Sequence, residues 1–164
     1  MVTFRFLDSH NDDEITRMSK LATSIVREHY DPLLGKEQND YMLELFQSER
    51  AIREQIKHGY EYYFVDRCGE DIGFIAFYER EKDIYLSKFY LKRCERKKGY
   101  SKLMLGFVID KAEEKGKKSI ELNVNKYNDA VMIYEKLGFI RVRDEKNDIG
   151  HGYYMDDFVY DYYL

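Results

Sequence analysis

One stretch of the sequence, residues 84–115, constrains the fold more than any other. Its first part, Ile84 to Leu91, is dense in aromatic and aliphatic side chains and is too short for a helix before the basic run that follows. From Leu103 onward apolar residues recur every three to four positions until Gly116, which is typical of a helix closed by glycine. The stretch therefore predicts a strand, a tight basic turn and a helix.

The predicted turn has the chemistry of a phosphate site. Its sequence is Arg96-Lys97-Lys98-Gly99-Tyr100-Ser101-Lys102. Free backbone N–H groups, the positive end of the helix dipole and cationic side chains converge at such a turn. The P-loop pattern and the three spaced glycines of dinucleotide-binding proteins are both missing. We therefore expect phosphate to bind here, outside those two classes of nucleotide site.

Two motifs resemble those of the GNAT superfamily of acyl-CoA-dependent N-acetyltransferases. Arg96 and Gly99 match the R/Q-x-x-G-x-G/A signature, whereas Ser101 stands where Gly or Ala is usual. A second motif follows, a strand and then a helix, and its matching positions are Asn128, Ala130, Tyr134, Leu137, Gly138 and Phe139. Two ordered motifs are much more specific than one. The resemblance covers residues 84–142.

The resemblance implies an α/β (α+β) fold with a mixed, mostly antiparallel central sheet flanked by helices. In this family the sheet splays beside its fourth strand, and the pantetheine arm of acyl-CoA lies in the gap. The sequence pattern supports this element order and indicates one domain, residues 1–164. We expect strands at 2–7, 61–66, 71–78, 84–91, 119–124, 139–143 and 153–163. Helices are expected from 12 to about 31, from about 36 to 57 with a break near 48, from about 102 to 115 and from 128 to 137, with a polar loop at 145–152.

Roles for individual residues follow from the same resemblance. Acetyl-CoA is the implied co-substrate, with no metal. The residues implied to bind it are Phe89, Tyr90 and Leu91 through their main chain, the turn Arg96, Lys97, Lys98, Gly99, Tyr100, Ser101 and Lys102, and Asn128. Tyr134 is the implied general acid, which protonates the departing thiolate after direct attack by the amine in a ternary complex.

The general base is left open by the sequence. Many family members carry an acid on the central strand, where this chain has Ser87 and Lys88. Glu28, Glu37, Glu79 or an ordered water all remain as alternatives. Lys88 is expected to be a strand residue that extends its charge into solvent.

The acceptor is expected to be a primary amine on a small molecule or a peptide. In this family the pocket is walled by the first two helices and the last hairpin, which here supply Tyr30, Asp31, Asp156 and Asp157. Acids interleaved with aromatics hold an ammonium group by charge and by cation–π attraction. The competing interpretation of residues 153–157 is an ordinary strand with polar side chains on its outer face.

Composition narrows the function classes. Lys and Arg number 27 against 31 Asp and Glu, so the formal net charge of −4 gives no basic field for nucleic acid. No apolar run approaches the ~20 residues of a membrane span. Cys68 and Cys94 match no metal or redox pattern, which predicts a reduced, cytoplasmic protein with inert thiols.

Three other functions remain compatible with the sequence. One is a non-catalytic acyl-CoA-binding or partner-binding module of the same fold. Another is an acetyltransferase for protein N-termini or charged tRNA, of which the tRNA variant is disfavoured by the net charge. A phosphate-binding regulatory domain is the third, although no base or ribose site is evident. Exposed strand edges leave room for a homodimer.

Overall fold

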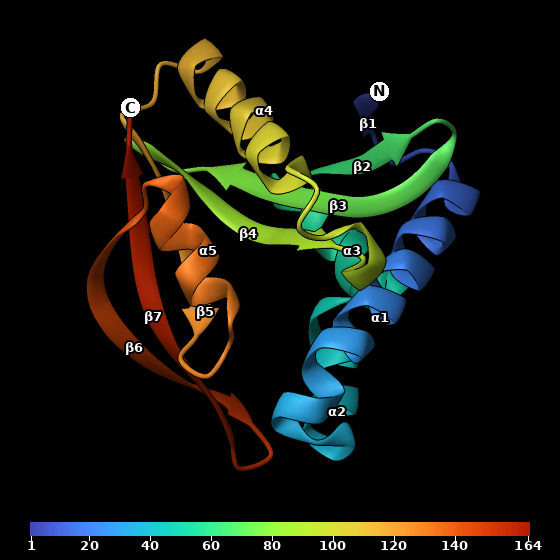
Figure 1. The fold of residues 1–164 in the computed structure, drawn as a ribbon. Coiled ribbons are helices and arrows are strands. Elements are labelled where there is room, and N and C mark those ends of the chain that lie inside the picture. Colours follow the sequence, from blue (N-terminus) through green and yellow to red (C-terminus); the bar gives the residue numbers. More distant parts are fainter.

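The computed structural model describes residues 1–164 and places seven strands in one twisted sheet with five α-helices around it (Figure 1). The strand order is β1-β2-β3-β4-β5-β7-β6, and every neighbouring pair is antiparallel except β4 and β5. The strands are β1 (Val2–Phe6), β2 (Glu61–Arg67), β3 (Glu70–Glu79), β4 (Asp83–Leu91), β5 (Ser119–Asn125), β6 (Ile140–Gly150) and β7 (Tyr153–Tyr163). The α-helices are α1 (Asp12–Leu34), α2 (Lys36–Phe46), α3 (Glu49–Lys57), α4 (Tyr100–Glu114) and α5 (Ala130–Leu137).

The sheet opens between its two parallel strands. Pairing of β4 with β5 runs from Asp83, opposite Ser119, to Tyr85, opposite Glu121, and stops there. Beyond that point a register shift in the β3–β4 pairing leaves Ser87 without a partner on β3. A bulge of this kind bends its strand and increases the local twist. The predicted fold class, a mixed and mostly antiparallel sheet splayed beside its fourth strand, is confirmed.

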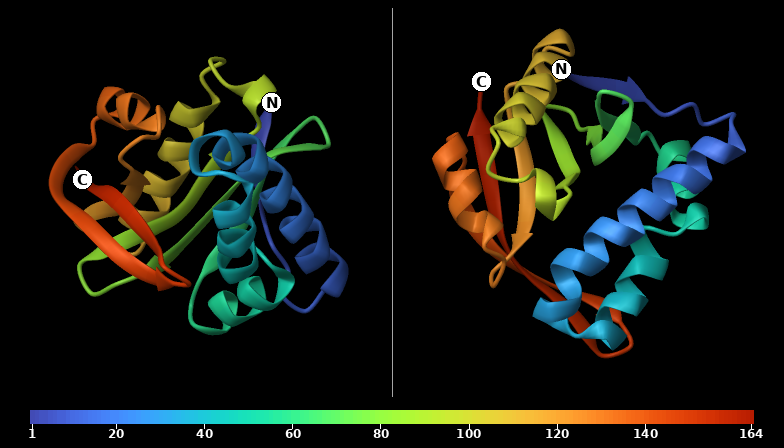
Figure 2. Two further views of the ribbon diagram at one scale, coloured as in Figure 1. Left: turned by 90° about the horizontal axis from the view of Figure 1, so that it is seen from below. Right: turned by 45° about the vertical axis from the view of Figure 1, so that its right-hand side comes forward.

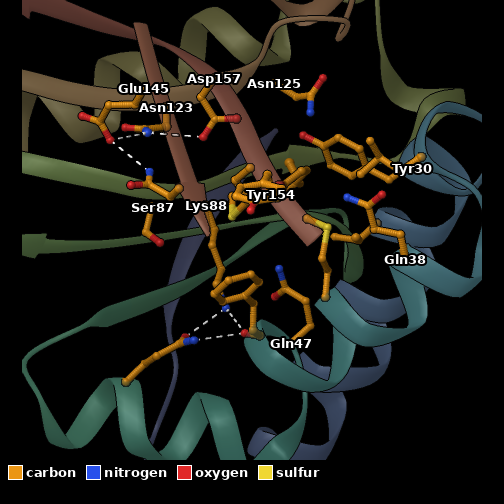
Figure 3. A pocket seen from close by; sticks show the side chains of 18 of the residues that line it. Tyr30, Gln38, Gln47, Ser87, Lys88, Asn123, Asn125, Glu145, Tyr154 and Asp157 are labelled. Carbon is orange, nitrogen blue, oxygen red and sulfur yellow. Dashed lines mark hydrogen bonds between the residues drawn. The ribbon is translucent and has the colours of Figure 1, made fainter. Parts of the chain in front are cut away.

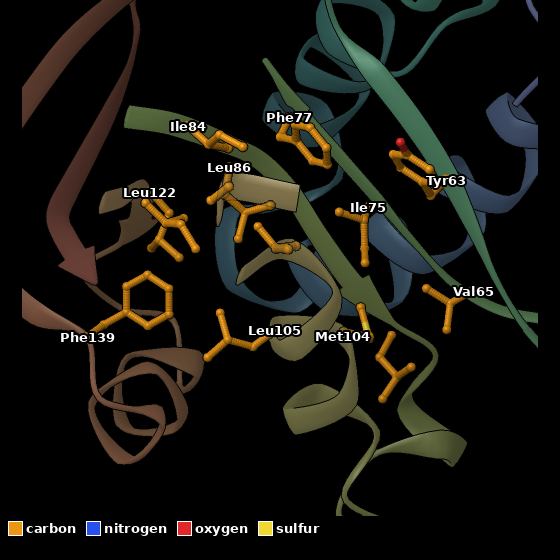
Figure 4. Packing of buried hydrophobic residues seen from close by; sticks show 14 of the residues in the cluster. Tyr63, Val65, Ile75, Phe77, Ile84, Leu86, Met104, Leu105, Leu122 and Phe139 are labelled. Atoms are coloured by element: carbon orange, nitrogen blue, oxygen red, sulfur yellow. The ribbon is translucent and has the colours of Figure 1, made fainter. Parts of the chain in front are cut away.

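Each face of the sheet carries its own hydrophobic core. Helices α4 and α5 cover one face, and α1, α2 and α3 cover the other (Figure 2). Alternation along β3 supplies both cores, because Ile75 and Phe77 point to the α4 face while Phe74 and Ala76 point to the α1 face. Figure 4 shows the α4 face, where Met104 packs among the strand side chains. The gap between β4 and β5 thus lies between two packed layers.

Helix α1 is longer than predicted. We expected it to end near Asp31–Pro32, but it continues to Leu34 and ends at Gly35, whose φ is 84°. Pro32 has no N–H to donate to the carbonyl of Glu28, four residues earlier. That carbonyl accepts instead from Arg93 Nη2 at 3.2 Å. A side chain from the turn after β4 therefore compensates for the proline and lets the helix reach the edge of the gap.

The last hairpin corrects another boundary. Residues 145–152 were predicted to be a loop, but β6 extends to Gly150 and pairs with β7 up to Tyr153. Most of β6 is exposed, because it is an edge strand without a covering helix, so the apolar–polar alternation that marks a strand is missing. The hairpin tip is fixed to α2, since the Tyr41 hydroxyl donates to the carbonyl of Ile149 and the Tyr41 ring contacts His151.

No helix is long and apolar enough to cross a membrane.

Candidate active site

Two cavities meet at the gap between β4 and β5. The larger, about 740 Å³, lies between α4, α5 and the splayed strands, and the smaller, about 320 Å³, lies between α1, α2 and the β6–β7 hairpin. Both volumes are within the range of ligand pockets. Four residues line both cavities: Tyr30, Ser87, Tyr90 and Asn123. The two cavities therefore adjoin at these four residues, which we call the junction.

The basic turn stands at the mouth of the larger cavity. Lys97 and Gly99 both have positive φ, 64° and 84°, and α4 begins immediately after them. A turn with such residues directs successive backbone N–H groups toward one point, and the first turn of a helix adds its own unpaired N–H groups. Arg96 is anchored beside it, with Nε 3.3 Å from the carbonyl of Leu91. This end of the cavity has the donors and the positive charge that a phosphate needs.

Most residues predicted to bind the cofactor line this larger cavity. They are Phe89, Tyr90, Leu91, Arg96, Lys97, Gly99, Ser101, Lys102 and Asn128, and the predicted acid Tyr134 lies among them. Two do not line it. Lys98 instead lies 3.4 Å from Glu95, and Tyr100 packs on the hydrophobic core of the α4 face.

Asn128 and Tyr30 connect the two halves of the site. Asn128 Oδ1 accepts from the N–H of Ala130, the first residue of α5, at 2.8 Å. The N-cap position is Asp129, and the helix begins two residues later than predicted. Asn128 Nδ2 donates to the Tyr30 hydroxyl at 3.1 Å, which joins α5 to α1 across the gap. Tyr134 faces the same space. Its pKa is raised, chiefly by burial and to a smaller extent by the nearby Tyr30. The Tyr134 phenol therefore keeps its proton at neutral pH.

The smaller cavity is acidic at the junction end. Asn123 Nδ2 lies 3.3 Å from Asp157 and 3.4 Å from Glu145, and Asn123 Oδ1 accepts from the Tyr85 hydroxyl at 2.8 Å (Figure 3). Burial raises the pKa of Asp157 to about 6, against the lowering effect of the Asn123 amide. The pKa of Glu145 is lowered, chiefly by its hydrogen bond with Asn147. Two carboxylates of different proton affinity thus lie beside the shared Asn123.

Lys88 lies where the sequence did not predict it. We expected its charge in solvent, but the residue is 4% exposed and lines the smaller cavity. Its Nζ donates to the carbonyl of Phe46 at 2.6 Å, to Gln55 Oε1 at 2.9 Å and to the Tyr62 hydroxyl. Burial lowers its pKa well below that of an ordinary lysine. The expectation was wrong because α2 and α3 cover this face of β4, which the local sequence does not show.

The four predicted acceptor residues are divided by the structure. Tyr30 lines both cavities and Asp157 lines the smaller one. Asp31 and Asp156 line neither: Asp31 accepts from Asn39 Nδ2 at 2.7 Å, and Asp156 lies 3.2 Å from Lys126 Nζ.

The bases left open by the sequence lie outside both cavities. Glu28 pairs with Arg93, and Glu79 with Lys115 and Lys117, whereas Glu37 lies in the first turn of α2. The carboxylates that do line the smaller cavity are Asp157 and Glu145. No cluster of His, Cys, Asp or Glu side chains in the chain has the composition of a metal site.

Sequence reasoning missed several residues that form the junction. Ser87 and Asn123 line both cavities, while Tyr85 and Glu145 line the smaller one. A signal was present for β5, where Asn123 and Asn125 interrupt an apolar strand at alternate positions and so share one face. No comparable signal marked Glu145, because its strand has a uniformly polar sequence.

Comparison with known families identifies the domain. A family model described as an acetyltransferase (GNAT) domain matches residues 30–153. Among curated proteins, no sequence matches the chain.

Solved structures resemble the chain over its whole length. The PaiA N-acetyltransferase of Thermoplasma acidophilum, in complex with coenzyme A, superposes with a TM-score of 0.81 at 18% identity, covering 100% of this chain and 99% of the other. A GNAT family acetyltransferase from Elizabethkingia anophelis with acetyl-CoA bound gives 0.68 at 16% identity, covering 99% and 98%. The ribosomal-protein-S18-alanine N-acetyltransferase of Escherichia coli gives 0.69 at 18% identity, covering 100% and 94%. At these identities the likeness shows the fold.

Proposed function

Because this chain belongs to the GNAT acetyltransferase family and is therefore an acetyl-CoA-dependent acyltransferase, we propose that it transfers the acetyl group to a primary amine. The acetyl-CoA is placed in the larger cavity and the amine in the smaller one. The observation that carries the proposal is the junction, where Tyr30, Ser87, Tyr90 and Asn123 border both cavities. An amine and a thioester bound on either side of that junction are held for direct attack.

The basic turn supports the placement of the cofactor. Positive φ at Lys97 and Gly99 orients backbone donors at the start of α4, and Arg96 lies beside them. These groups match the phosphates of coenzyme A. Toward the junction, the pairing of β4 with β5 ends at Tyr85, so later residues of β4 have main-chain groups free for the pantetheine amides.

The proposed reaction needs a group that accepts a proton from the amine and a group that donates a proton to the thiolate. The amine must lose its ammonium proton to become a nucleophile, and Asp157, whose pKa is about 6, is placed to bind the ammonium and to take that proton. The nitrogen forms a bond to the acetyl carbon, and the C–S bond breaks. The thiolate then takes a proton from the Tyr134 phenol. After attack the nitrogen carries one proton more than the amide product keeps, and this proton restores the Tyr134 phenol through solvent, while Asp157 releases its own proton to solvent. The products are an N-acetyl amine and free coenzyme A.

The proposal is tested by thiol release. Purified protein is incubated with acetyl-CoA and a panel of primary amines, and coenzyme A is measured with a thiol reagent while the amine product is identified by mass spectrometry. Amine-dependent release with a matching N-acetyl product supports the proposal. Tight acetyl-CoA binding without release for any amine, peptide amines included, contradicts it and favours a non-catalytic acyl-CoA-binding module.

A further inference from the structure

The smaller cavity has carboxylates at one end and a buried lysine at the other. The carboxylates of Asp157 and Glu145 lie beside Asn123, at the junction with the larger cavity, whereas Lys88 extends to the opposite end (Figure 3). Apolar side chains such as Met42 and Met155 also contribute to the wall. An occupant that spans this cavity therefore meets carboxylates at the thioester end and the Lys88 amino group at the far end.

Lys88 has no counter-ion in the chain. Its three partners, the Phe46 carbonyl, Gln55 Oε1 and the Tyr62 hydroxyl, are all neutral. Burial among neutral partners disfavours the ammonium form of Lys88 and lowers its pKa, and an anion that approaches the amino group favours the ammonium form. The far end of the cavity is consequently complementary to an anionic group.

Gln47 gives a second, independent indication at the same end. The residue is 6% exposed, lines the cavity, and its Oε1 has no hydrogen-bond partner. It directly follows Phe46, whose carbonyl binds Lys88. Rotation of the amide presents either an N–H or an oxygen to the cavity. A buried amide left unpaired costs free energy, so a polar group of the occupant is expected beside it.

We infer that the natural acceptor is a small zwitterion, with a primary amine at one end and a carboxylate at the other. The inference rests on the proposed function, because the amine is assigned to the end that meets the thioester. The ammonium lies against Asp157, and the carboxylate lies against Lys88 and Gln47. A plain alkylamine offers no anion to Lys88 and leaves Gln47 Oε1 unpaired, and a diamine places a second ammonium group beside the Lys88 amino group.

Three six-carbon amines of matched length test the inference on the unmodified protein: ε-aminocaproate, n-hexylamine and hexamethylenediamine. With saturating acetyl-CoA, kcat/KM for the amino acid should exceed that for either amine by about tenfold or more, as expected for one additional ionic contact. Shorter and longer ω-amino acids, each compared with its alkylamine, locate the best span. Equal kcat/KM with and without the carboxylate at every length overturns the inference, as does preference for the diamine.

A pair of lysine variants assigns the preference to Lys88. In Lys88→Met the ratio of kcat/KM for the amino acid to kcat/KM for hexylamine should fall to about one, through a higher KM for the amino acid. Lys57→Met, on the exposed end of α3, should behave as the wild type. If Lys88→Met does not fold, the wild-type series decides alone. If no amine releases thiol, the proposed function fails, and calorimetric binding of ε-aminocaproate against hexylamine in the presence of coenzyme A still decides the inference.

Discussion

The two cavities differ in how the chain builds them. The larger is formed largely by two short stretches, residues 86–104 and 122–137, with a turn and main-chain groups as its polar features. The smaller draws side chains from α1, α2, β4, β5 and the β6–β7 hairpin, which are far apart in sequence. A site made from local backbone geometry is specified by a motif. A site made from side chains that meet only after folding is free to change with each protein.

The largest effect is expected at the turn that defines the cofactor cavity. Gly99→Val places a β-branched residue at φ 84°, a backbone conformation that costs such residues roughly 1–3 kcal/mol. The turn should rearrange, and affinity for coenzyme A should fall by about a hundredfold or more, measured by calorimetry. Gly116→Val is the matched control, since Gly116 has φ 69° and also lies in open space, at the other end of α4. Normal coenzyme A affinity in Gly99→Val contradicts the phosphate site.

Removal of the proposed acid should have the next largest effect. Tyr134→Phe keeps the ring but loses the proton donor, so kcat should fall by about a hundredfold or more while coenzyme A affinity is unchanged. Tyr163→Phe is a suitable control, because Tyr163 is 60% exposed and lines neither cavity. Unchanged turnover across the pH range in Tyr134→Phe refutes the assignment of the acid.

A smaller, pH-dependent effect is expected at the acidic end of the acceptor cavity. Since the pKa of Asp157 is about 6, wild-type kcat/KM for a cationic amine should rise as the pH increases through 6. Asp157→Asn should remove that rise and increase KM by about tenfold. Asp156→Asn is the adjacent control, whose carboxylate pairs with Lys126 and lines neither cavity. If both variants change KM equally, the ammonium site lies elsewhere.

The same substitution makes a prediction about stability. Asp157 has a pKa in the folded protein above the ordinary 3.8, so the folded state binds its proton more tightly than the unfolded state. The contribution of Asp157 to the free energy of unfolding therefore decreases as the pH rises from about 4 to about 6. Asp157→Asn should have a higher Tm than the wild type above pH 6 and the same Tm near pH 3. A lower Tm at neutral pH is the opposite of this expectation.

The smallest effect is expected where the hairpin closes the acceptor cavity. Tyr41→Phe removes the hydrogen bond from α2 to the Ile149 carbonyl, worth about 0.5–1.5 kcal/mol. The looser hairpin should raise KM for the amine a few-fold with little change in coenzyme A affinity. Tyr163→Phe, at the opposite end of β7, controls for loss of a tyrosine hydroxyl. An equal loss of coenzyme A affinity means that the two cavities are not independent.

The sequence predicted the parts that depend on local patterns and missed the parts that depend on contacts between distant segments. The strand–turn–helix of residues 84–115 and the helix after Asn128 were predictable because their patterns are local. The end of α1 was not, because Arg93, from a distant turn, satisfies the carbonyl that Pro32 leaves free. Lys88 was misjudged for the same reason: its burial depends on helices α2 and α3, which cover β4.

The most direct test of the two-cavity site is the steady-state rate pattern. Initial rates are measured while acetyl-CoA and the best amine are varied together. Direct attack across the junction requires both substrates to be bound at once, so the double-reciprocal lines should intersect. Protein incubated with radiolabelled acetyl-CoA in the absence of amine should carry no covalently bound label. Parallel lines with a stable acetylated protein contradict direct transfer and place a covalent intermediate between two separate half-reactions.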